Sequence, residues 1–427
     1  MADLAHPAPA RPSRRAVWSW ALYDLANTIF SMNIISLYFP IWVVNEMGGR
    51  DGHVSIANAI AMGMIILAAP VLGALSDQSP RRMPFLIGST VVCCLATMFM
   101  GFGTLTLGLV LFVFANAAFQ SSGIFYDALL STVSTESDRG RVGGLGISIG
   151  YVGAFLGVIM GLSVLELTDD GIAYVFAGTA IMFAGFSLPC FFWVRERRRL
   201  VSRPPVTTAV RGAFSNVRET IRRLRHYSGL RRFLIGRLFY TDAANTLIVF
   251  MAVYVTNETG FTDTEAQILL MAGIAGAIPG GLIWGRIVDR TGPRSSLLAV
   301  QWIWVAIFCA AAAIPVVELP AWLFWIVAPL AGATLAGTWT ADRPFMLRLS
   351  PPRHLGQFYG LYSIMGRFAS ITGPLTWALI VDVLVWGRPF AVFTLTFSVI
   401  IAFILIRPVS DHVREWSPEE QDSVGEG

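Results

Sequence analysis

The feature of this sequence that most constrains its fold is a series of long apolar runs. A helix that crosses a bilayer needs roughly 20 mostly apolar residues, and a backbone surrounded by lipid must form helices or a closed barrel. Such runs can be marked at approximately 17–44, 54–75, 84–103, 106–131, 143–166, 171–194, 233–256, 266–288, 296–317, 321–342, 356–381 and 389–406. They are too long for barrel strands, which alternate over about ten residues. Because only 14% of the residues are charged, against roughly a quarter in soluble domains, we predict an all-α membrane protein with twelve transmembrane helices.

The arginines indicate which side of the membrane each loop faces. All 31 basic residues are arginine, and all but four fall in the N-terminal segment, in alternate loops and in the tail, with Arg343 assigned to the 343–353 loop. Arg50 and Arg388 lie in the other loops, while Arg237 and Arg367 fall within apolar runs. Since basic loops stay on the cytoplasmic side, both termini are predicted to be cytoplasmic, in a multi-pass protein of the cytoplasmic (inner) membrane. The net charge of +4 then reflects topology, and no nucleic-acid partner is expected.

These spans divide the chain into two bundles with basic and acidic segments around them. We predict a cytoplasmic N-terminus at 1–16, a six-helix bundle at 17–194, a basic linker at 195–232, a second six-helix bundle at 233–407 and an acidic, disordered cytoplasmic tail at 408–427. The linker begins with an arginine cluster and continues past a Pro-Pro break in a helix-compatible stretch. It is interpreted either as an amphipathic helix on anionic lipid or as a basic linker that only supplies the topology signal.

Polar landmarks recur between the two halves at an offset of about 215 residues, which indicates duplicated structure. The sequence DLANT at 24–28 matches DAANT at 242–246, and GLGISIG from 144 matches GLYSIMG from 360. A glycine leads an aspartate by four residues at Asp77 and again at Asp289, and Asp127 pairs with Asp342. We therefore predict that the two bundles are related by pseudo-symmetry.

The landmarks carry a resemblance to a known family of transporters. A Gly four residues before an Asp, followed by basic residues between the second and third spans, resembles the loop motif of the major facilitator superfamily. Within it, WALYDLANTIF (20–30), YDALLS (126–131) and LRLSPPRHLGQFYGLY (347–362) resemble the vacuole-effluxer-like branch, named for fungal vacuolar amino-acid exporters. The resemblance implies a major facilitator fold in which the first and seventh spans line a central cavity.

Ionisable residues inside the spans are few, and they are the candidates for binding. A charge within a span costs roughly 2.5 to 3.5 kcal/mol on insertion scales, so such groups mark functional sites by default. Asp24 and Asn27 share one helix face, as do Asp242 and Asn245, so the halves could oppose two Asp-Asn pairs. The carboxylates could carry a coupling proton or, with the amide oxygens, Na⁺. Alternatively, each aspartate only fixes helix packing.

Two arginines within spans and a set of charges at the span ends complete the predicted sites. Arg367 falls near the middle of the eleventh span and could bind a substrate carboxylate or phosphate, or form a structural ion pair; Arg237 lies about one turn into the seventh span, from where it could snorkel to the cytoplasm. A cytoplasmic gate, or alternatively a topology signal alone, is predicted from Asp77, Arg81 and Asp127 in the first half and Asp289, Arg290, Arg294 and Asp342 in the second.

Enzymatic chemistry is not expected from this sequence. There is no Lys for a phosphate loop or a Schiff base, and no Cys or His spacing suited to zinc. Neither a metal nor any other cofactor is predicted, apart from a coupling H⁺ or Na⁺, and the lipid bilayer and a small-molecule substrate are the only partners implied.

The function that these features favour is secondary active transport. We predict a carrier of a small organic solute, an amino acid or similar amphipathic metabolite, that works by alternating access with proton or cation coupling. A lipid or amphiphile flippase of the same fold would need a laterally open apolar groove. A membrane receptor or assembly factor without flux would be expected to have a sizeable soluble module, and the longest loop is only 195–232.

Overall fold

The computed structural model describes residues 13–49, 51–167, 171–196, 227–351 and 355–411. Most of the predicted N-terminus (1–16), the centre of the predicted linker (195–232) and most of the predicted tail (408–427) lie outside the described residues, and with them the predicted amphipathic helix. The first described residue, Ser13, caps helix α1 by accepting a hydrogen bond from the Ala16 amide at 3.2 Å.

The first bundle follows the predicted runs closely. Its first helix, α1 (Arg14–Phe30), continues without a turn through the π-helical segment η1 (Ser31–Tyr38), the short α2 (Phe39–Ile41) and η2 (Trp42–Glu46). The other helices are α3 (Asp51–Asp77), α4 (Met83–Phe99), α5 (Leu105–Val133), α6 (Arg139–Leu167) and α7 (Gly171–Trp193). Helix α1 packs against α6 and α7, and α4 packs against α5 and α7.

The second bundle repeats this order after the linker. It contains α9 (Ser228–Thr259), α10 (Asp263–Thr291), α11 (Pro293–Val316), the 3₁₀ turn η3 (Ala321–Leu323), α12 (Phe324–Leu349), α13 (Leu355–Ala378) with its π-helical end η5 (Leu379–Val383), and α14 (Arg388–Ile406). Two loops that join these helices reverse direction through glycines at positive φ, Gly260 and Gly292, a backbone conformation that residues with a Cβ rarely adopt.

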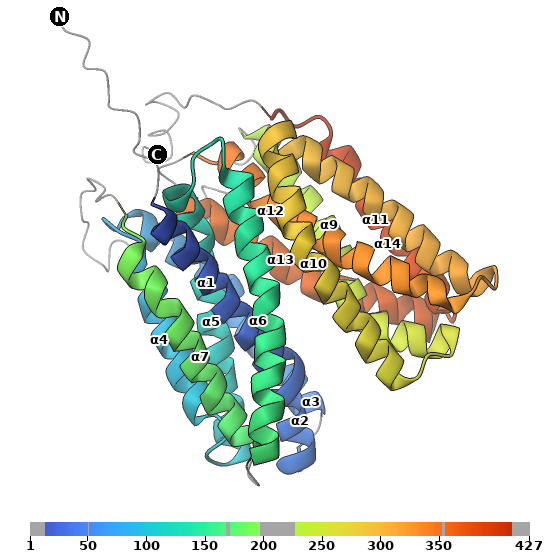
Figure 1. The fold of residues 1–427 in the computed structure, drawn as a ribbon, viewed down its shortest axis with the longest axis horizontal. Helices are drawn as coiled ribbons and strands as arrows, with labels where there is room; N and C mark the ends of the chain where they lie inside the picture. The colour runs from blue at the N-terminus through green and yellow to red at the C-terminus, as the bar shows by residue number, and fades with distance from the viewer. Residues whose placement is uncertain (1–12, 50, 168–170, 197–226, 352–354, 412–427) are drawn as a thin grey trace, which may run out of the picture.

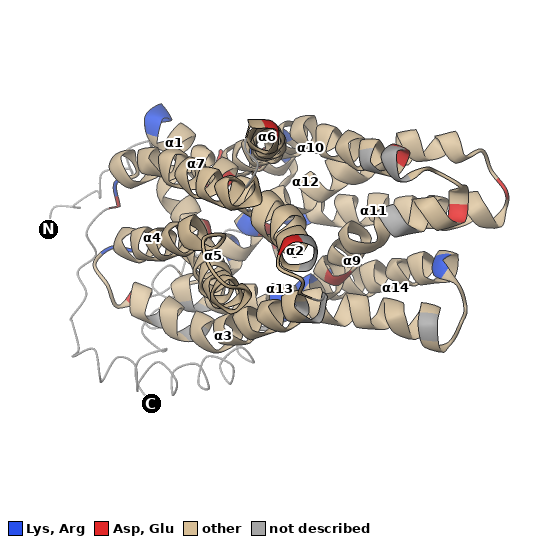
Figure 2. Cartoon of the chain, turned by 90° about the horizontal axis from the view of Figure 1, so that it is seen from below, with Lys and Arg blue, Asp and Glu red and all other residues tan. Residues whose placement is uncertain are grey.

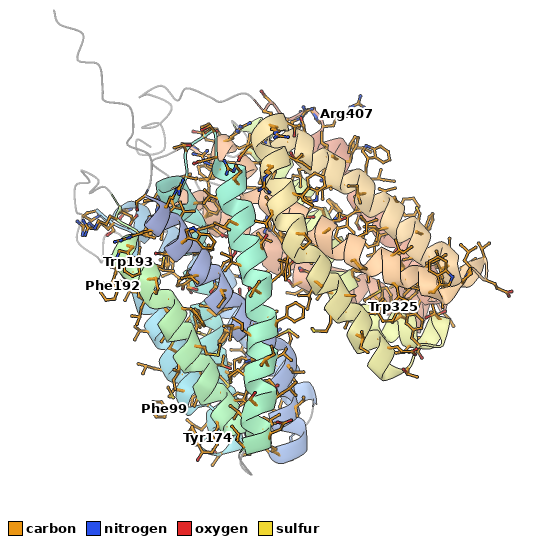
Figure 3. All side chains as sticks on the ribbon, viewed as in Figure 1. Phe99, Tyr174, Phe192, Trp193, Trp325 and Arg407 are labelled. Carbon is orange, nitrogen blue, oxygen red and sulfur yellow. The ribbon has the colours of Figure 1, made fainter. Side chains whose placement is uncertain are left out.

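Nine helices of the described chain are long and apolar enough to cross a membrane, or ten if the two arms of α3, bent by 44° after Ala69, form one span. The protein is therefore a multi-pass membrane protein. Helix α4 is apolar but only 17 residues long, and the first span is divided by π-helical turns, so the number twelve stays a prediction. Large apolar side chains such as Phe99, Tyr174, Phe192 and Trp193 cover the outer face (Figure 3), where lipid can solvate them.

The two bundles meet near one end and diverge toward the other (Figure 1). The near end is where α1 begins and α14 ends, and we call it the closed end; the opposite end is the open end. Helix α6 packs against α10, and α3 against α13, across the boundary between bundles. A Cβ on Gly144 would collide with the Gly281 carbonyl oxygen, so glycine is what lets α6 and α10 approach so closely. Seen from below, long stretches of helix carry no charge (Figure 2).

Candidate functional site

A polar cavity of about 360 Å³ lies between the bundles, at the lower end of the range of small-molecule sites, roughly 300–1,000 Å³. Side chains of α1, α5 and α6 form one wall, and side chains of α9, α12 and α13 form the other. Its charged and hydrogen-bonding side chains are Asp24, Thr28, Gln120, Asp127, Tyr151, Arg237, Thr241, Asn245, Trp339, Arg343, Tyr359, Tyr362, Ser363, Arg367 and Ser370.

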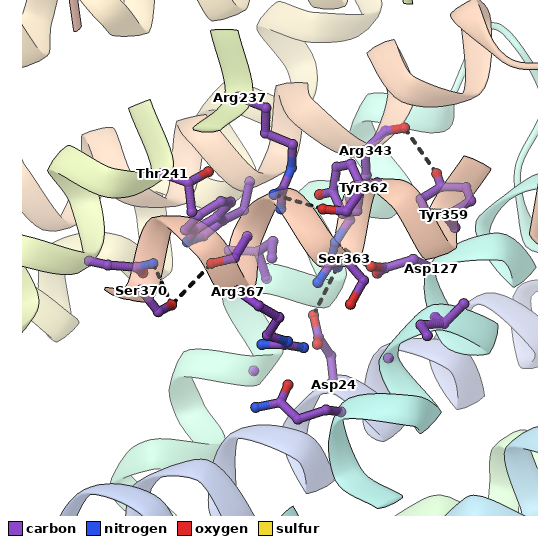
Figure 4. A pocket seen from close by; sticks show the side chains of 18 of the residues that line it. Asp24, Asp127, Arg237, Thr241, Arg343, Tyr359, Tyr362, Ser363, Arg367 and Ser370 are labelled. Carbon is purple, nitrogen blue, oxygen red and sulfur yellow. Dashed lines mark hydrogen bonds and ion pairs between the residues drawn. The ribbon is translucent and has the colours of Figure 1, made fainter. Parts of the chain in front are cut away.

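Arg343 joins the two halves inside this cavity. From α12 its guanidinium reaches Asp24 of α1 at 3.4 Å and Asp127 of α5 at 3.1 Å (Figure 4). The three side chains are only 10–15% exposed. Its Cζ also lies 5.6 Å from the centre of the Tyr126 ring. The prediction that Arg343 lies in a cytoplasmic loop is wrong, because α12 continues to Leu349 and carries this side chain toward the bundle boundary. Two carboxylates thus share one arginine.

A second ion pair forms the wall of the cavity within the second half. The Nε of Arg237 donates to Asp342 at 3.2 Å, while the Arg237 Cζ stacks 3.5 Å from the centre of the Tyr362 ring. Asp342 also accepts a hydrogen bond from the Tyr362 hydroxyl at 2.9 Å. Arg237 is 6% exposed, so it does not snorkel to the cytoplasm as the sequence allowed. Asp342, predicted as part of the gate, is instead the buried partner of Arg237.

Arg367 has no charged partner in the described chain. It extends from α13 into the cavity in the direction of Asp24 (Figure 4), and its Nε is buried without a hydrogen-bond partner among the described residues. A desolvated guanidinium with free donors is costly unless a ligand supplies acceptors. Arg367 therefore extends into the cavity with an unpartnered Nε, and its role as a substrate ligand stays a prediction.

The two predicted Asp-Asn pairs do not oppose each other. Asp24 and Asn245 line the central cavity, and Asn27 lines an adjoining cavity that also contains Asp24. Asp242 instead lines a different cavity between α9, α13 and α14, where it accepts a hydrogen bond from Thr372. The reason is helical geometry: Asp242 is one residue from the cavity-lining position 241, and each residue turns a helix by about 100°.

Two aspartates of the predicted gate hold helix N-termini of the opposite half at the closed end. Asp77 accepts hydrogen bonds from the Arg82 guanidinium at 2.7 Å and from the Gly356 amide, at the start of α13, at 2.9 Å. Arg81, the predicted partner, is exposed, so that pairing is wrong. Asp127 lies in the cavity with Arg343 and does not contact this cluster.

In the second half, Asp289 accepts hydrogen bonds from the Gly140 and Arg141 amides at the start of α6, at 2.7 and 3.0 Å. This contact repeats that of Asp77 and obeys the predicted pseudo-symmetry. A carboxylate near a helix N-terminus is stabilised by the free amides and the helix dipole. Arg290 is exposed, whereas the Arg294 guanidinium donates to the Arg407 carbonyl oxygen.

A further contact at the closed end connects the residues after α14 to both halves. Arg348 binds Asp411 at 2.8 Å and Glu136, between α5 and α6, at 3.0 Å. The pKa of Asp411 is raised above its ordinary value, because its partial burial outweighs the opposing effect of the Arg348 guanidinium. Residue 411, part of the predicted disordered tail, is therefore packed against the transmembrane bundle.

The described ranges contain no group of three or more His, Cys, Asp or Glu side chains that could hold a metal ion. The four cysteines are free. The chemistry of the cavity thus comes from carboxylates, guanidinium groups, hydroxyls and amides.

The chain is similar in sequence to known proteins. A family model described as vacuole effluxer Atg22 like matches residues 50–413. An uncharacterized MFS-type transporter of Bacillus subtilis, YxiO, is 27% identical over 428 residues, which cover 95% of this chain and 97% of the relative. Autophagy-related protein 22-1 of Neosartorya fischeri is 25% identical over 279 residues, which cover 59% of this chain and 45% of that protein.

Solved structures of transporters are also similar. The major facilitator transporter FucP in its outward conformation superposes with a TM-score of 0.72 at 15% identity, over 93% of this chain and 99% of its own. The human organic anion transporter MFSD10 has the same TM-score and identity, over 93% of this chain and 100% of its own. At this identity the likeness shows the fold alone.

Proposed function

The chain belongs to the vacuole effluxer Atg22-like family and has the fold of a major facilitator transporter, and from this premise we propose what it moves and how. It carries a small organic solute, an amino acid or similar amphipathic metabolite, through the central cavity by alternating access. Transport is coupled to a proton or another cation. The closed end faces the cytoplasm, so that the arrangement described above is outward-facing.

The observation that carries this proposal is the link from Arg343 to Asp24 and Asp127 across the bundle boundary. A rocking-bundle carrier must break its contacts between halves in each cycle. When Arg343 leaves Asp24, the carboxylate loses its only charged partner in the described chain, and at membrane depth it needs a proton or another cation in its place. The contact of Arg343 with Asp24 and Asp127 therefore couples the relative position of the two bundles to the binding of a proton or cation in the cavity.

The rest of the cavity suits an amphipathic solute with separated charges. Arg367 offers free donors for a carboxylate, and the two carboxylates that share Arg343 offer sites for an ammonium group. Ile124, Ile147 and Trp339 supply apolar surface in the same cavity. This mixed lining is unlike the apolar, laterally open groove that a flippase requires.

The test uses purified protein in liposomes and a panel of radiolabelled amino acids, sugars and organic anions, each assayed with and without an inward gradient of protons or Na⁺. We expect saturable uptake of an amino acid, enhanced by one of the gradients. Failure of every solute to enter faster than in protein-free liposomes, or movement of a fluorescent lipid between leaflets alone, would contradict the proposal.

Substitution of Asp24 separates coupling from binding. Asp24→Asn keeps the shape and removes the titratable group, so we expect gradient-driven accumulation to fall at least roughly tenfold, which corresponds to about 1.4 kcal/mol, while exchange of labelled for unlabelled solute survives. Glu258→Gln, which removes a carboxylate paired with Arg388 away from the cavity, is the matched control and should accumulate normally. Full accumulation in Asp24→Asn, with unchanged pH dependence, would leave Asp24 as a structural residue.

A further inference from the structure

A second cavity, of about 200 Å³ and with a mainly apolar lining, lies between α9, α13 and α14. It shares no lining residue with the central cavity. Asp242 contributes the one carboxylate, and hydroxyls come from Thr372, Thr376, Thr394 and Ser398. Phe239, Trp377 and Leu395 supply apolar surface around them.

The charge of Asp242 is uncompensated in the described chain. Asp24, Asp127 and Asp342 each have a guanidinium within 3.4 Å, whereas Asp242 has only the Thr372 hydroxyl as a side-chain partner. Asp242 lies 13 residues after Gly229, the start of its span, or about 20 Å at 1.5 Å per residue. The Asp242 side chain is partly buried, and Thr372 and Thr376 beside it are exposed. A lone carboxylate at that depth is expensive, so we expect it to bind a proton or another cation.

The hydroxyls around Asp242 are arranged as acceptors. Thr376 donates its hydroxyl proton to the Thr372 carbonyl oxygen at 2.9 Å, and Thr394 donates its proton to the Ala391 carbonyl oxygen at 2.7 Å. The Thr372 hydroxyl can turn from Asp242 to the Phe368 carbonyl oxygen at 3.2 Å. In each case the proton is satisfied within its own helix, and the oxygen lone pairs remain for a ligand.

The same residues form pairs one turn apart on two helices. Thr372 and Thr376 lie on one face of α13, and Thr394 and Ser398 lie on one face of α14, since i and i+4 residues are neighbours on a helix. With the Asp242 carboxylate from α9, three helices bring up to five oxygen-bearing side chains to one cavity. Hard cations select such oxygen sets.

We infer that the cavity between α9, α13 and α14 is a sodium site, with Asp242 as its charged ligand and the hydroxyls of Thr372, Thr376, Thr394 and Ser398 as neutral ligands. One Na⁺ neutralises Asp242 without a protein cation. Because α9 and α13 also carry Asn245, Arg367 and Ser370 of the central cavity, the ion would stabilise the wall to which the solute binds. Only this role as coupling ion rests on the proposed transport function.

Binding can be measured without transport. Purified protein is incubated with ²²Na⁺ in choline chloride of constant ionic strength, and bound label is displaced with NaCl or KCl. We expect saturable binding that NaCl displaces and KCl does not. Asp242→Asn should weaken binding at least roughly tenfold, and Thr376→Val and Ser398→Ala should each weaken it severalfold, as expected from loss of a charged or a neutral ligand. Thr396→Val is the matched control, because Thr396 lies on α14 with Ser398 but contacts Cys309. This variant should bind Na⁺ like the wild type.

Three outcomes would overturn the inference. These are absence of specific ²²Na⁺ binding to the folded wild type, undiminished binding in Asp242→Asn, or a thermal stability that responds to pH through Asp242 but not to Na⁺, which would identify a proton site. Variants are compared only where size-exclusion profiles match the wild type; if Asp242→Asn does not fold, Thr376→Val and Ser398→Ala decide the result. Since no solute is present, failure of the sodium site leaves the proposed transport untouched, and failure of transport leaves the binding result untouched.

Discussion

At the scale of single residues, three arginines in one cavity have different partners and so different roles. Arg237 is held by Asp342 and by the Tyr362 ring, and Arg343 is shared by Asp24 and Asp127. Arg367 has no ion-pair partner in the described part of the chain. A buried ion pair is costly to break on one side, whereas an unpartnered charge is costly to keep. We therefore expect Arg237 to contribute to the stability of the protein and Arg367 to contribute to solute binding.

The first prediction compares these two side chains. Arg367→Gln should fold like the wild type but lose about 1.5–3 kcal/mol of solute binding, roughly a tenfold to hundredfold rise in Kd, because a charged hydrogen bond to the ligand is removed. Arg237→Gln should lower protein stability by about 3–5 kcal/mol, because Asp342 would remain buried without its cation. Thermal melting and solute binding, measured on both purified variants, check the prediction. A normal Kd in Arg367→Gln would exclude it as a solute ligand.

At the scale of elements, the closed end depends on two helix N-termini. The Asp77 carboxylate accepts a hydrogen bond from the N-terminus of α13, and the Asp289 carboxylate accepts one from the N-terminus of α6. In each case the carboxylate belongs to the opposite half. Such a cap is lost as soon as the bundles separate at this end. The free energy of each cap thus contributes to holding the closed end shut.

The second prediction follows from these caps. Asp289→Asn should favour opening of the closed end roughly tenfold, as expected for loss of about 1.4 kcal/mol of charge and dipole stabilisation. The reporter is Ser76→Cys in a chain whose native cysteines are replaced, because Ser76 is fully buried beside Gly356. Its labelling by a membrane-permeant maleimide should accelerate accordingly.

Arg82 provides a second test, and the neighbouring Arg81 provides the control. Arg82→Gln should accelerate labelling because Arg82 binds Asp77, whereas Arg81→Gln should not, because Arg81 is exposed. Equal labelling of the wild type, Asp289→Asn and Arg82→Gln would remove the assignment of these residues to a gate.

At the scale of the whole molecule, the two bundles place alternate loops at opposite ends. The loop between α5 and α6 lies at the closed end, where Gly140 meets Asp289, and the arginine distribution predicts that this end is cytoplasmic. Single cysteines at Ser137 and Glu318, on the loops that follow α5 and α11, test the orientation. An impermeant thiol reagent added to intact cells should label Glu318→Cys and not Ser137→Cys. The reverse pattern would invert the topology.

From the sequence by itself, the apolar runs, the duplication and the family could be predicted. Bilayer thickness fixes how many apolar residues a crossing helix needs, and duplicated motifs keep their order, so both are readable along the chain. The sequence also singled out Asp24 and Arg367, because a charge inside an apolar run is conspicuous wherever its partner lies. The count of twelve spans and the cytoplasmic termini stay predictions, and the labelling experiment tests the orientation.

Only the tertiary structure decided which charges meet. The sequence predicts that Arg343 lies in a loop because its apolar run ends there, yet α12 continues past it and directs it at Asp24 and Asp127, more than 200 residues away. Asp242 repeats the motif of Asp24 but faces a different cavity. Likewise, Asp77 forms its ion pair with Arg82 and not with the adjacent Arg81. The physical reason is that a shift of one residue turns a side chain by about 100° around its helix, and the packing of the two bundles, which no local pattern encodes, decides what it then faces.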